Sequence, residues 1–132
     1  MTYIFDACAL IAFLGKEPEG LKTKEFLDRA TAGEFSVYMN IINLAEVYYH
    51  YIHDVGIINA DEIMRYIDIL PIGIIDTISE AIYRTASRYK GLYPISLADA
   101  FAAATASALS ATLITKDDEF RQIKAAEKLS IK

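Results

Sequence analysis

Apolar and polar positions follow two patterns along the chain, and these predict strands and helices in turn. Short apolar runs rich in β-branched or aromatic residues, such as TYIF at 2–5, are typical of strands buried on both faces. Longer stretches with apolar residues every three or four positions, such as GLKTKEFLDRATA at 20–32, are typical of amphipathic helices. Strands are predicted at 2–5, 35–39, 72–75 and 112–115, with a further short one at 129–131. Helices are predicted at 7–14, 20–32, 41–55, 60–70, 77–90, 97–111 and 118–128.

The helix boundaries carry signals of their own. Asn40 and Ser96 stand where a side-chain oxygen can cap the amino-terminus of the next helix. Asn59 with Glu62 resembles a capping box that opens the helix at 60–70. Four helices are predicted to end at a glycine, since glycine commonly terminates helices: Gly15, Gly33, Gly56 and Gly91.

Strands that alternate with helices predict an α/β fold. We expect three α/β/α layers around a central, mostly parallel sheet of four to five strands, in a single domain over residues 1–132. Sheets of this kind place their sites beyond the carboxyl ends of the strands. Residues that follow the predicted strands are therefore the first candidates for function.

Composition narrows the class of protein. The chain has 132 residues, of which 54% are hydrophobic and 23% charged, so it has enough apolar side chains for a core. A single cysteine, Cys8, excludes a disulfide framework and a paired-cysteine metal site. The first residues lack a basic region and include Asp6, unlike a signal peptide. No apolar run approaches the roughly 18 residues that a membrane span needs, so we expect a soluble, cytoplasmic protein.

Four carboxylates from distant segments are predicted to converge at one edge of the sheet. Asp6 follows the first strand, Asp117 follows the strand at 112–115, Asp99 lies in the first turn of a helix, and Glu46 lies in the second turn of another. Taken singly, the three aspartates are better explained as helix caps or first-turn acids than as functional residues. Glu46 has no such explanation.

The helix at 41–55 is apolar on most faces, including three tyrosines. Its polar stripe consists of Asn43, Glu46, His50 and His53, which either faces water or lines a groove. Glu46 and His53 lie about 10 Å apart along a helix, too far to share one zinc ion. We expect the histidines to lie on the surface or along a substrate path.

The order and spacing of these pieces resemble a known family, the PIN-domain nucleases, and within it the VapC-type toxins of toxin–antitoxin pairs. The matching segments are YIFDACALIAFL, NLAEVYY, ISLADAFAAATA and LITKDDEF, which together span nearly the whole chain. The resemblance implies that Asp6, Glu46, Asp99 and Asp117 are metal-binding acids and that Glu119 is a less constant fifth acid. Support is expected from Thr115 and Asn43. Cys8 departs from the family, which usually has a Ser or Thr hydroxyl at that position, and we interpret this thiol as buried and non-catalytic.

The resemblance implies an endoribonuclease dependent on Mg²⁺, for which Mn²⁺ may substitute, that hydrolyses RNA with a metal-activated water. It further implies a cognate antitoxin partner and a homodimer, and nine tyrosines agree with an extensive interface. All-oxygen ligands suit such hard cations, and a bound cation reverses the local negative charge. The net charge of −5 does not exclude an RNA substrate, because the five acids named above account for it.

Two other functions remain open at this point. One is a catalytically silent PIN-like module that binds RNA or protein. The other is phosphotransfer through an aspartyl phosphate, although that chemistry would want a second acid where Cys8 stands. Basic residues that would hold a substrate are few, and each is as well explained by a solvated helix face: Arg84, Arg88, Lys90, Lys116 and Arg121.

Overall fold

The computed structural model describes residues 1–127 and 129–132 of the chain. The strands are β1 (Thr2–Phe5), β2 (Ser36–Asn40), β3 (Gly73–Ile75) and β4 (Thr112–Ile114). The helices are α1 (Ala7–Leu14), α2 (Gly20–Thr31), α3 (Ile41–Val55), α4 (Ile57–Asp68), α5 (Glu80–Leu92), α6 (Leu97–Ala108) and α7 (Arg121–Glu127), and a 3₁₀ turn covers Asp118–Phe120. None of the described helices is both long and apolar enough to cross a membrane.

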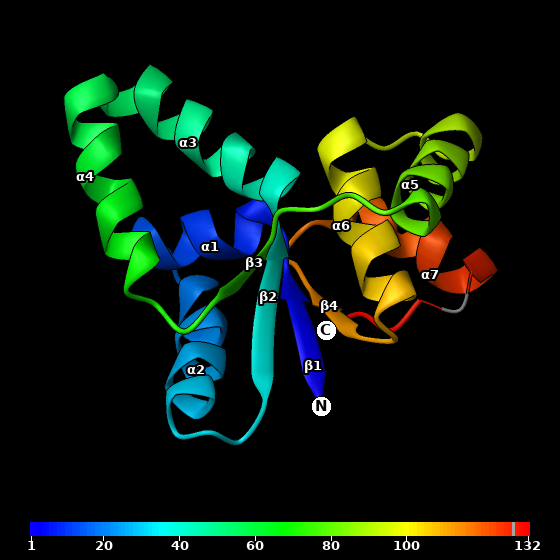
Figure 1. Cartoon of the computed structure of the whole chain (residues 1–132), viewed down its shortest axis with the longest axis horizontal. Helices are drawn as coiled ribbons and strands as arrows, with labels where there is room; N and C mark the ends of the chain where they lie inside the picture. The colour runs from blue at the N-terminus through cyan, green and yellow to red at the C-terminus, as the bar shows by residue number, and fades with distance from the viewer. Residues whose placement is uncertain (128) are drawn as a thin grey trace.

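The four strands form one parallel sheet in the order β3-β2-β1-β4. Figure 1 shows α1 to α4 on one side of this sheet and α5, α6 and α7 on the other. The predicted three-layer α/β/α fold is therefore confirmed, with four strands. In place of the short strand expected at 129–131, a single bridge joins Ile131 to Leu113 at the free edge of β4.

Alternation along β1 divides the core into two halves. Ile4 packs with the side chains of α5 and α6, whereas Tyr3 and Phe5 pack with those of α1 to α4. Successive residues of a strand point to opposite faces, so a strand covered on both faces must be apolar throughout. This is the physical reason for the continuous apolar run at 2–5.

The predicted start of the fourth helix is wrong. The sequence favoured a capping box at Asn59 and Glu62, but α4 begins at Ile57, directly after α3. Gly56 turns the chain within one residue because it adopts a φ of 85°, which favours glycine. Asn59 lies inside α4, where its Nδ2 donates to the carbonyl of Val55 at 3.0 Å.

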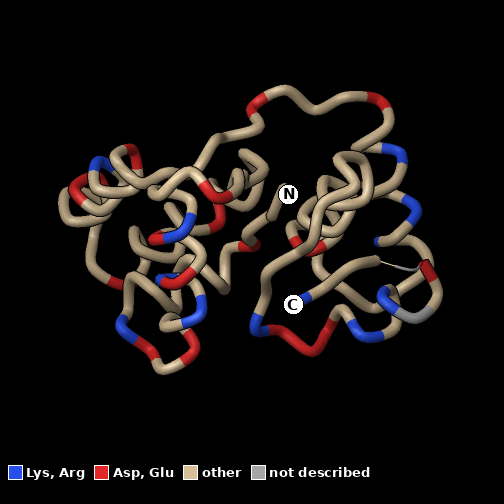
Figure 2. Tube along the Cα trace, turned by 90° about the horizontal axis from the view of Figure 1, so that it is seen from below, with Lys and Arg blue, Asp and Glu red and all other residues tan. Residues whose placement is uncertain are grey.

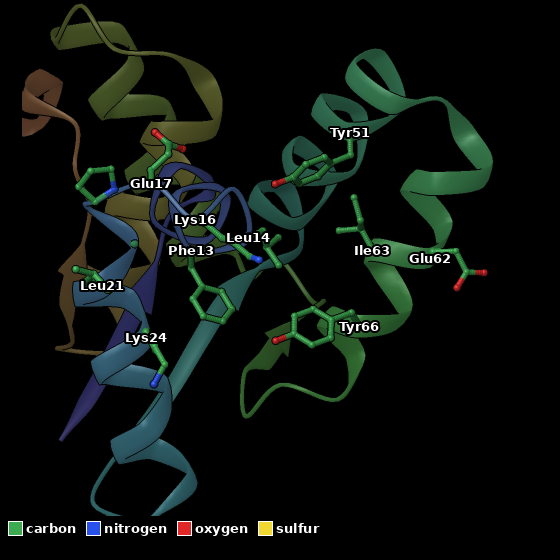
Figure 3. Close-up of a pocket in the computed structure, with 12 residues that line it drawn as sticks. Phe13, Leu14, Lys16, Glu17, Leu21, Lys24, Tyr51, Glu62, Ile63 and Tyr66 are labelled. Atoms are coloured by element: carbon green, nitrogen blue, oxygen red, sulfur yellow. The ribbon is translucent and has the colours of Figure 1, made fainter.

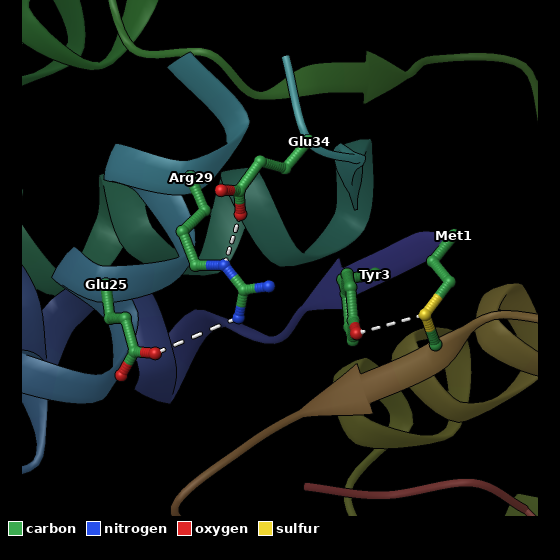
Figure 4. Close-up of polar contacts among 5 residues, drawn as sticks. All are labelled: Met1, Tyr3, Glu25, Arg29 and Glu34. Atoms are coloured by element: carbon green, nitrogen blue, oxygen red, sulfur yellow. Dashed lines mark hydrogen bonds and ion pairs between the residues drawn. The ribbon is translucent and has the colours of Figure 1, made fainter. Parts of the chain in front are cut away.

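Other boundaries shift by a few residues. The helix expected at 77–90 begins at Glu80, where Ser79 caps it, and it continues through Gly91 to Leu92. The helix expected at 97–111 ends at Ala108. At the end of the sheet opposite the strand carboxyl ends, Arg29 pairs with Glu25 within α2 and with Glu34 across the turn that leads into β2 (Figure 4).

Candidate metal centre

Asp6 follows β1 directly and caps α1, so its carboxyl is fixed at the carboxyl end of the sheet. Its Oδ1 accepts a hydrogen bond from the backbone N–H of Ala9 at 2.8 Å, and its side chain is fully buried. Burial raises the pKa of Asp6 to about 6, while the Thr115 hydroxyl beside it offsets part of the rise. The charges of Asp117 and Glu46 raise this pKa further.

The segment after β4 brings three acids together. Carboxylate oxygens of Asp99, Asp117 and Glu119 all lie within 4.8 Å of one another. Asp117 is held by two bonds of its own turn: its N–H donates to Thr115 Oγ1, and its Oδ1 accepts from the N–H of Glu119, each at 2.9 Å. Thr115 therefore positions Asp117 through the backbone.

Asp99 and Glu119 are linked through the start of α6. Ser96 caps this helix by accepting the N–H of Asp99 on its Oγ at 3.1 Å. The backbone N–H of Ser96 in turn donates to Glu119 Oε1 at 2.7 Å. Burial raises the pKa of Asp99 to about 8, and the hydrogen bond and charge of Glu119 contribute to that rise. Without a cation, the surroundings of Asp99 therefore favour its protonated form.

α3 contributes Glu46 and Asn43 to the same edge. Burial raises the pKa of Glu46, and the charges of Glu119 and Asp117 raise it further, so Glu46 faces the cluster. Asn43 lies one turn earlier, is fully buried, and donates from Nδ2 to the carbonyl of Ala98 at 2.9 Å. The polar stripe of this helix therefore faces the site at its first two positions.

A second amide joins the same two helices. Asn40 accepts the N–H of Ile42 on Oδ1 and donates from Nδ2 to Thr105 Oγ1, at 2.8 and 2.9 Å. The pairs Asn40–Thr105 and Asn43–Ala98 thus tie α3 to α6, and these helices carry Glu46 and Asp99.

Three buried oxygens at this edge indicate what the site could hold. Among the described residues, Asp6 Oδ2, Asn43 Oδ1 and Glu46 Oε1 are buried and accept no hydrogen bond. Buried acceptors without a donor are costly, and a bound cation or its water shell would satisfy them. A set of metal ligands made only of oxygen atoms fits Mg²⁺, Mn²⁺ or Ca²⁺. The arrangement can therefore hold a hard divalent cation.

Cys8 lies half-buried beside these acids. Burial raises the pKa of its thiol to about 12, with Asp6 and Asp99 adding to the rise. The thiol therefore stays protonated at neutral pH, which argues against a thiolate nucleophile or metal ligand.

The residues considered for zinc and for substrate binding are not part of the acidic cluster, although the charge of His50 lowers the pKa of Glu46. His50 and His53 are exposed, and the one group of three potential metal ligands found in the described part of the chain contains no histidine. Most of the basic candidates form ion pairs: Arg84 with Glu80, Arg88 with Glu127, Lys116 with Glu17, and Arg121 with Asp118. Lys and Arg are spread over both halves of the molecule (Figure 2).

One residue that touches this edge was missed by the sequence reasoning. Lys22, in the first turn of α2, donates from Nζ to the Thr115 carbonyl at 3.3 Å, although the two residues lie 93 positions apart. No sequence pattern connects them, because the contact depends on how α2 packs against the sheet.

Comparison with known proteins identifies the family to which the chain belongs. Residues 3–126 match the family model for the PIN domain, and the chain therefore belongs to the PIN-domain family. The resemblance predicted from the sequence motifs is confirmed. A comparison with curated proteins finds no match.

Solved structures show the same fold. The chain is similar to one in the structure of VapBC2 from Rickettsia felis bound to a DNA fragment from its promoter, with 22% identity and a TM-score of 0.74 over 100% of this chain and 98% of that one. VapBC-1 from nontypeable Haemophilus influenzae is similar at 18% identity and a TM-score of 0.74, over 100% and 97% of the two chains. VapBC-5 from Mycobacterium tuberculosis is similar at 14% and 0.60, over 98% and 96%.

Proposed function

We propose that this PIN-domain protein is a divalent-metal-dependent endoribonuclease and the toxin of a toxin–antitoxin pair. The observation that carries the proposal is the cluster of Asp99, Asp117 and Glu119. At the same edge of the sheet, Asp6 Oδ2 and Glu46 Oε1 are buried without a hydrogen-bond donor. The structures named above come from VapBC complexes, one of them described as a member of a toxin–antitoxin family. Mg²⁺ is the expected cation, with Mn²⁺ as a substitute.

The roles of the side chains follow from their positions. Asp6, Asp99, Asp117 and Glu46 would hold the cation, and Glu119 would add a carboxylate beside Asp99. Bound there, a divalent cation lowers the pKa of a water ligand and stabilises the charge that develops on the phosphate. Glu46 projects from α3 and is suited to orienting the water. Thr115 keeps Asp117 in place, and Asn43 fixes the separation of α3 and α6.

An Asp99→Asn substitution tests the proposal. We expect it to lower the rate of RNA cleavage by at least about 100-fold, because an amide is neutral and a poor ligand for Mg²⁺. Cleavage of a mixed-sequence RNA, followed on denaturing gels with Mg²⁺ or Mn²⁺, measures this rate. The matched control is Asp68→Asn, which removes one exposed carboxylate on α4 and should cut at the normal rate.

The outcomes distinguish the competing functions. Equal cleavage by both variants would contradict the assignment of the site. RNA that is bound but never cut by the unmodified protein would favour the silent binding module. A phosphorylated aspartate after incubation with a phosphodonor would favour phosphotransfer, even though Cys8 occupies the position where that chemistry would want a second acid.

An apolar groove on the protein is suited to binding an antitoxin segment. A cavity of about 930 Å³ lies between two helix pairs: Phe13 and Leu14 at the end of α1 face Tyr51, Ile63 and Tyr66 from α3 and α4, and α2 also lines it (Figure 3). Its apolar floor suits the apolar face of a partner helix. We place an antitoxin segment here.

Ile63→Glu should prevent co-purification with the antitoxin, whereas Ile69→Glu, on the exposed end of the same hairpin, should not.

A further inference from the structure

The acidic edge of the sheet raises a problem for a substrate that is a polyanion. Sequence-independent binding of RNA depends on lysine and arginine at phosphates. Seven basic side chains of the described residues are paired with carboxylates, which cancels much of their charge: Lys24, Arg29, Arg65, Arg84, Arg88, Lys116 and Arg121. Cations that remain available beside the site are therefore few.

Lys22 is such a cation. Its Nζ donates to a backbone carbonyl, that of Thr115, and it takes part in none of the ion pairs found between described residues. A carbonyl is neutral, so the ammonium keeps its full charge, and two of its three donors remain free. The contact fixes its location, because Thr115 lies beside Asp6 and accepts the N–H of Asp117.

The first turn of α2, which carries the exposed Lys22, is packed closely against α1. The next residue, Thr23, is buried and donates from Oγ1 to the carbonyl of Ala9 at 2.8 Å. Gly20 approaches α1 so closely that a Cβ there would lie 2.4 Å from the carbonyl oxygen of Ala12. α1 begins directly after Asp6. The backbone of Lys22 is thereby fixed relative to the proposed metal ligands, which is what a phosphate contact near the scissile bond requires.

We propose that Lys22 is a phosphate-binding residue for RNA at the rim formed by α2 and the end of β4. This inference rests on the proposed function and adds to it the residue that offsets the local negative charge. Lys116, which follows Thr115, is less suited to this role because its Nζ is already paired with Glu17 at 2.7 Å.

The experiment compares Lys22→Gln with Lys24→Gln, both in an Asp99→Asn background so that RNA is not cut. The two substitutions lie on the same helix and change the net charge equally, but Lys24 is already paired with Asp28 at 2.6 Å. Binding of a short fluorescein-labelled single-stranded RNA is measured by anisotropy over a range of salt concentrations. We expect Lys22→Gln to weaken binding several-fold and to reduce the slope of log K against log salt by about 0.7, the value for one phosphate contact on a single strand. Lys22→Arg should restore the slope, and Lys24→Gln should leave it unchanged.

The outcomes separate this inference from the proposed function. Equal slopes for Lys22→Gln and Lys24→Gln, with RNA still bound, would overturn the role of Lys22 and leave the nuclease intact. Failure of the Asp99→Asn protein itself to bind RNA would overturn both. A loss of thermal stability in Lys22→Gln without a change in slope would show that the residue only caps the end of β4.

Discussion

At the residue scale, two acids of the site, Asp6 and Asp99, lose their protons less readily than a carboxyl in water. Burial raises the pKa of Asp6 from 3.8 to about 6 and that of Asp99 from 3.8 to about 8. A folded state with raised carboxyl pKa values retains protons that the unfolded chain releases. Without a cation the site therefore opposes folding at neutral pH, and a divalent cation would remove that opposition.

This predicts a pH dependence for the metal-free protein. Between about pH 4 and pH 8 the folded state binds more protons than the unfolded state, so the free energy of unfolding must fall as the pH rises. Each retained proton contributes a slope of about 1.4 kcal/mol per pH unit. Urea unfolding in EDTA at several pH values measures it, and Asp6→Asn should flatten the slope below pH 6. A stability that stays level across this range would show that the carboxyls are solvated with ordinary pKa values, and one that rises would show that their pKa values are lowered by folding.

At the element scale, two helix contacts decide where the site residues lie. The amides of Asn40 and Asn43 tie α3 to α6, and Gly20 lets α2 pack closely on α1. Neither contact is visible as a sequence pattern, since an asparagine or glycine near a helix start has several ordinary explanations. Both act on the metal site through the helices that carry its residues.

Two glycine substitutions of opposite effect test the second contact. Gly20→Ala would place a Cβ 2.4 Å from the Ala12 carbonyl oxygen, so α2 must shift, and we expect a loss of about 1–3 kcal/mol in the free energy of unfolding. Gly91→Ala, within α5, meets no atom within 4 Å and should gain about 0.5–1 kcal/mol because alanine favours helix. Denaturant unfolding measures both. Equal effects would mean that the α1–α2 contact is loose.

At the scale of the whole molecule, the sequence predicted the architecture well and the surroundings of the site poorly. The alternation of strands and helices and the position of Asp6 and Asp117 after strands follow from local patterns. The proximity of Glu119 to Asp99, the burial of Asn43 and the contact of Lys22 with Thr115 depend on how helices pack. The start of α4 was mistaken because a capping signal at Asn59 competed with a glycine turn at Gly56.

We propose that the protein forms a homodimer through the exposed apolar side chains of the α3–α4 hairpin. Ile57, Ile58 and Ile69 are 58%, 78% and 77% exposed, at the two ends of α4 on a hairpin that projects from the sheet (Figure 1). Burial of such side chains in an interface gains about 25 cal/mol per Å² of apolar surface removed from water. We expect light scattering at micromolar concentration to give the mass of two chains, and Ile58→Glu to give the mass of one. Leu92→Glu changes a similarly exposed side chain on α5, in the opposite helical layer, and should leave the dimer intact. The mass of one chain for the unmodified protein at every concentration would contradict the dimer.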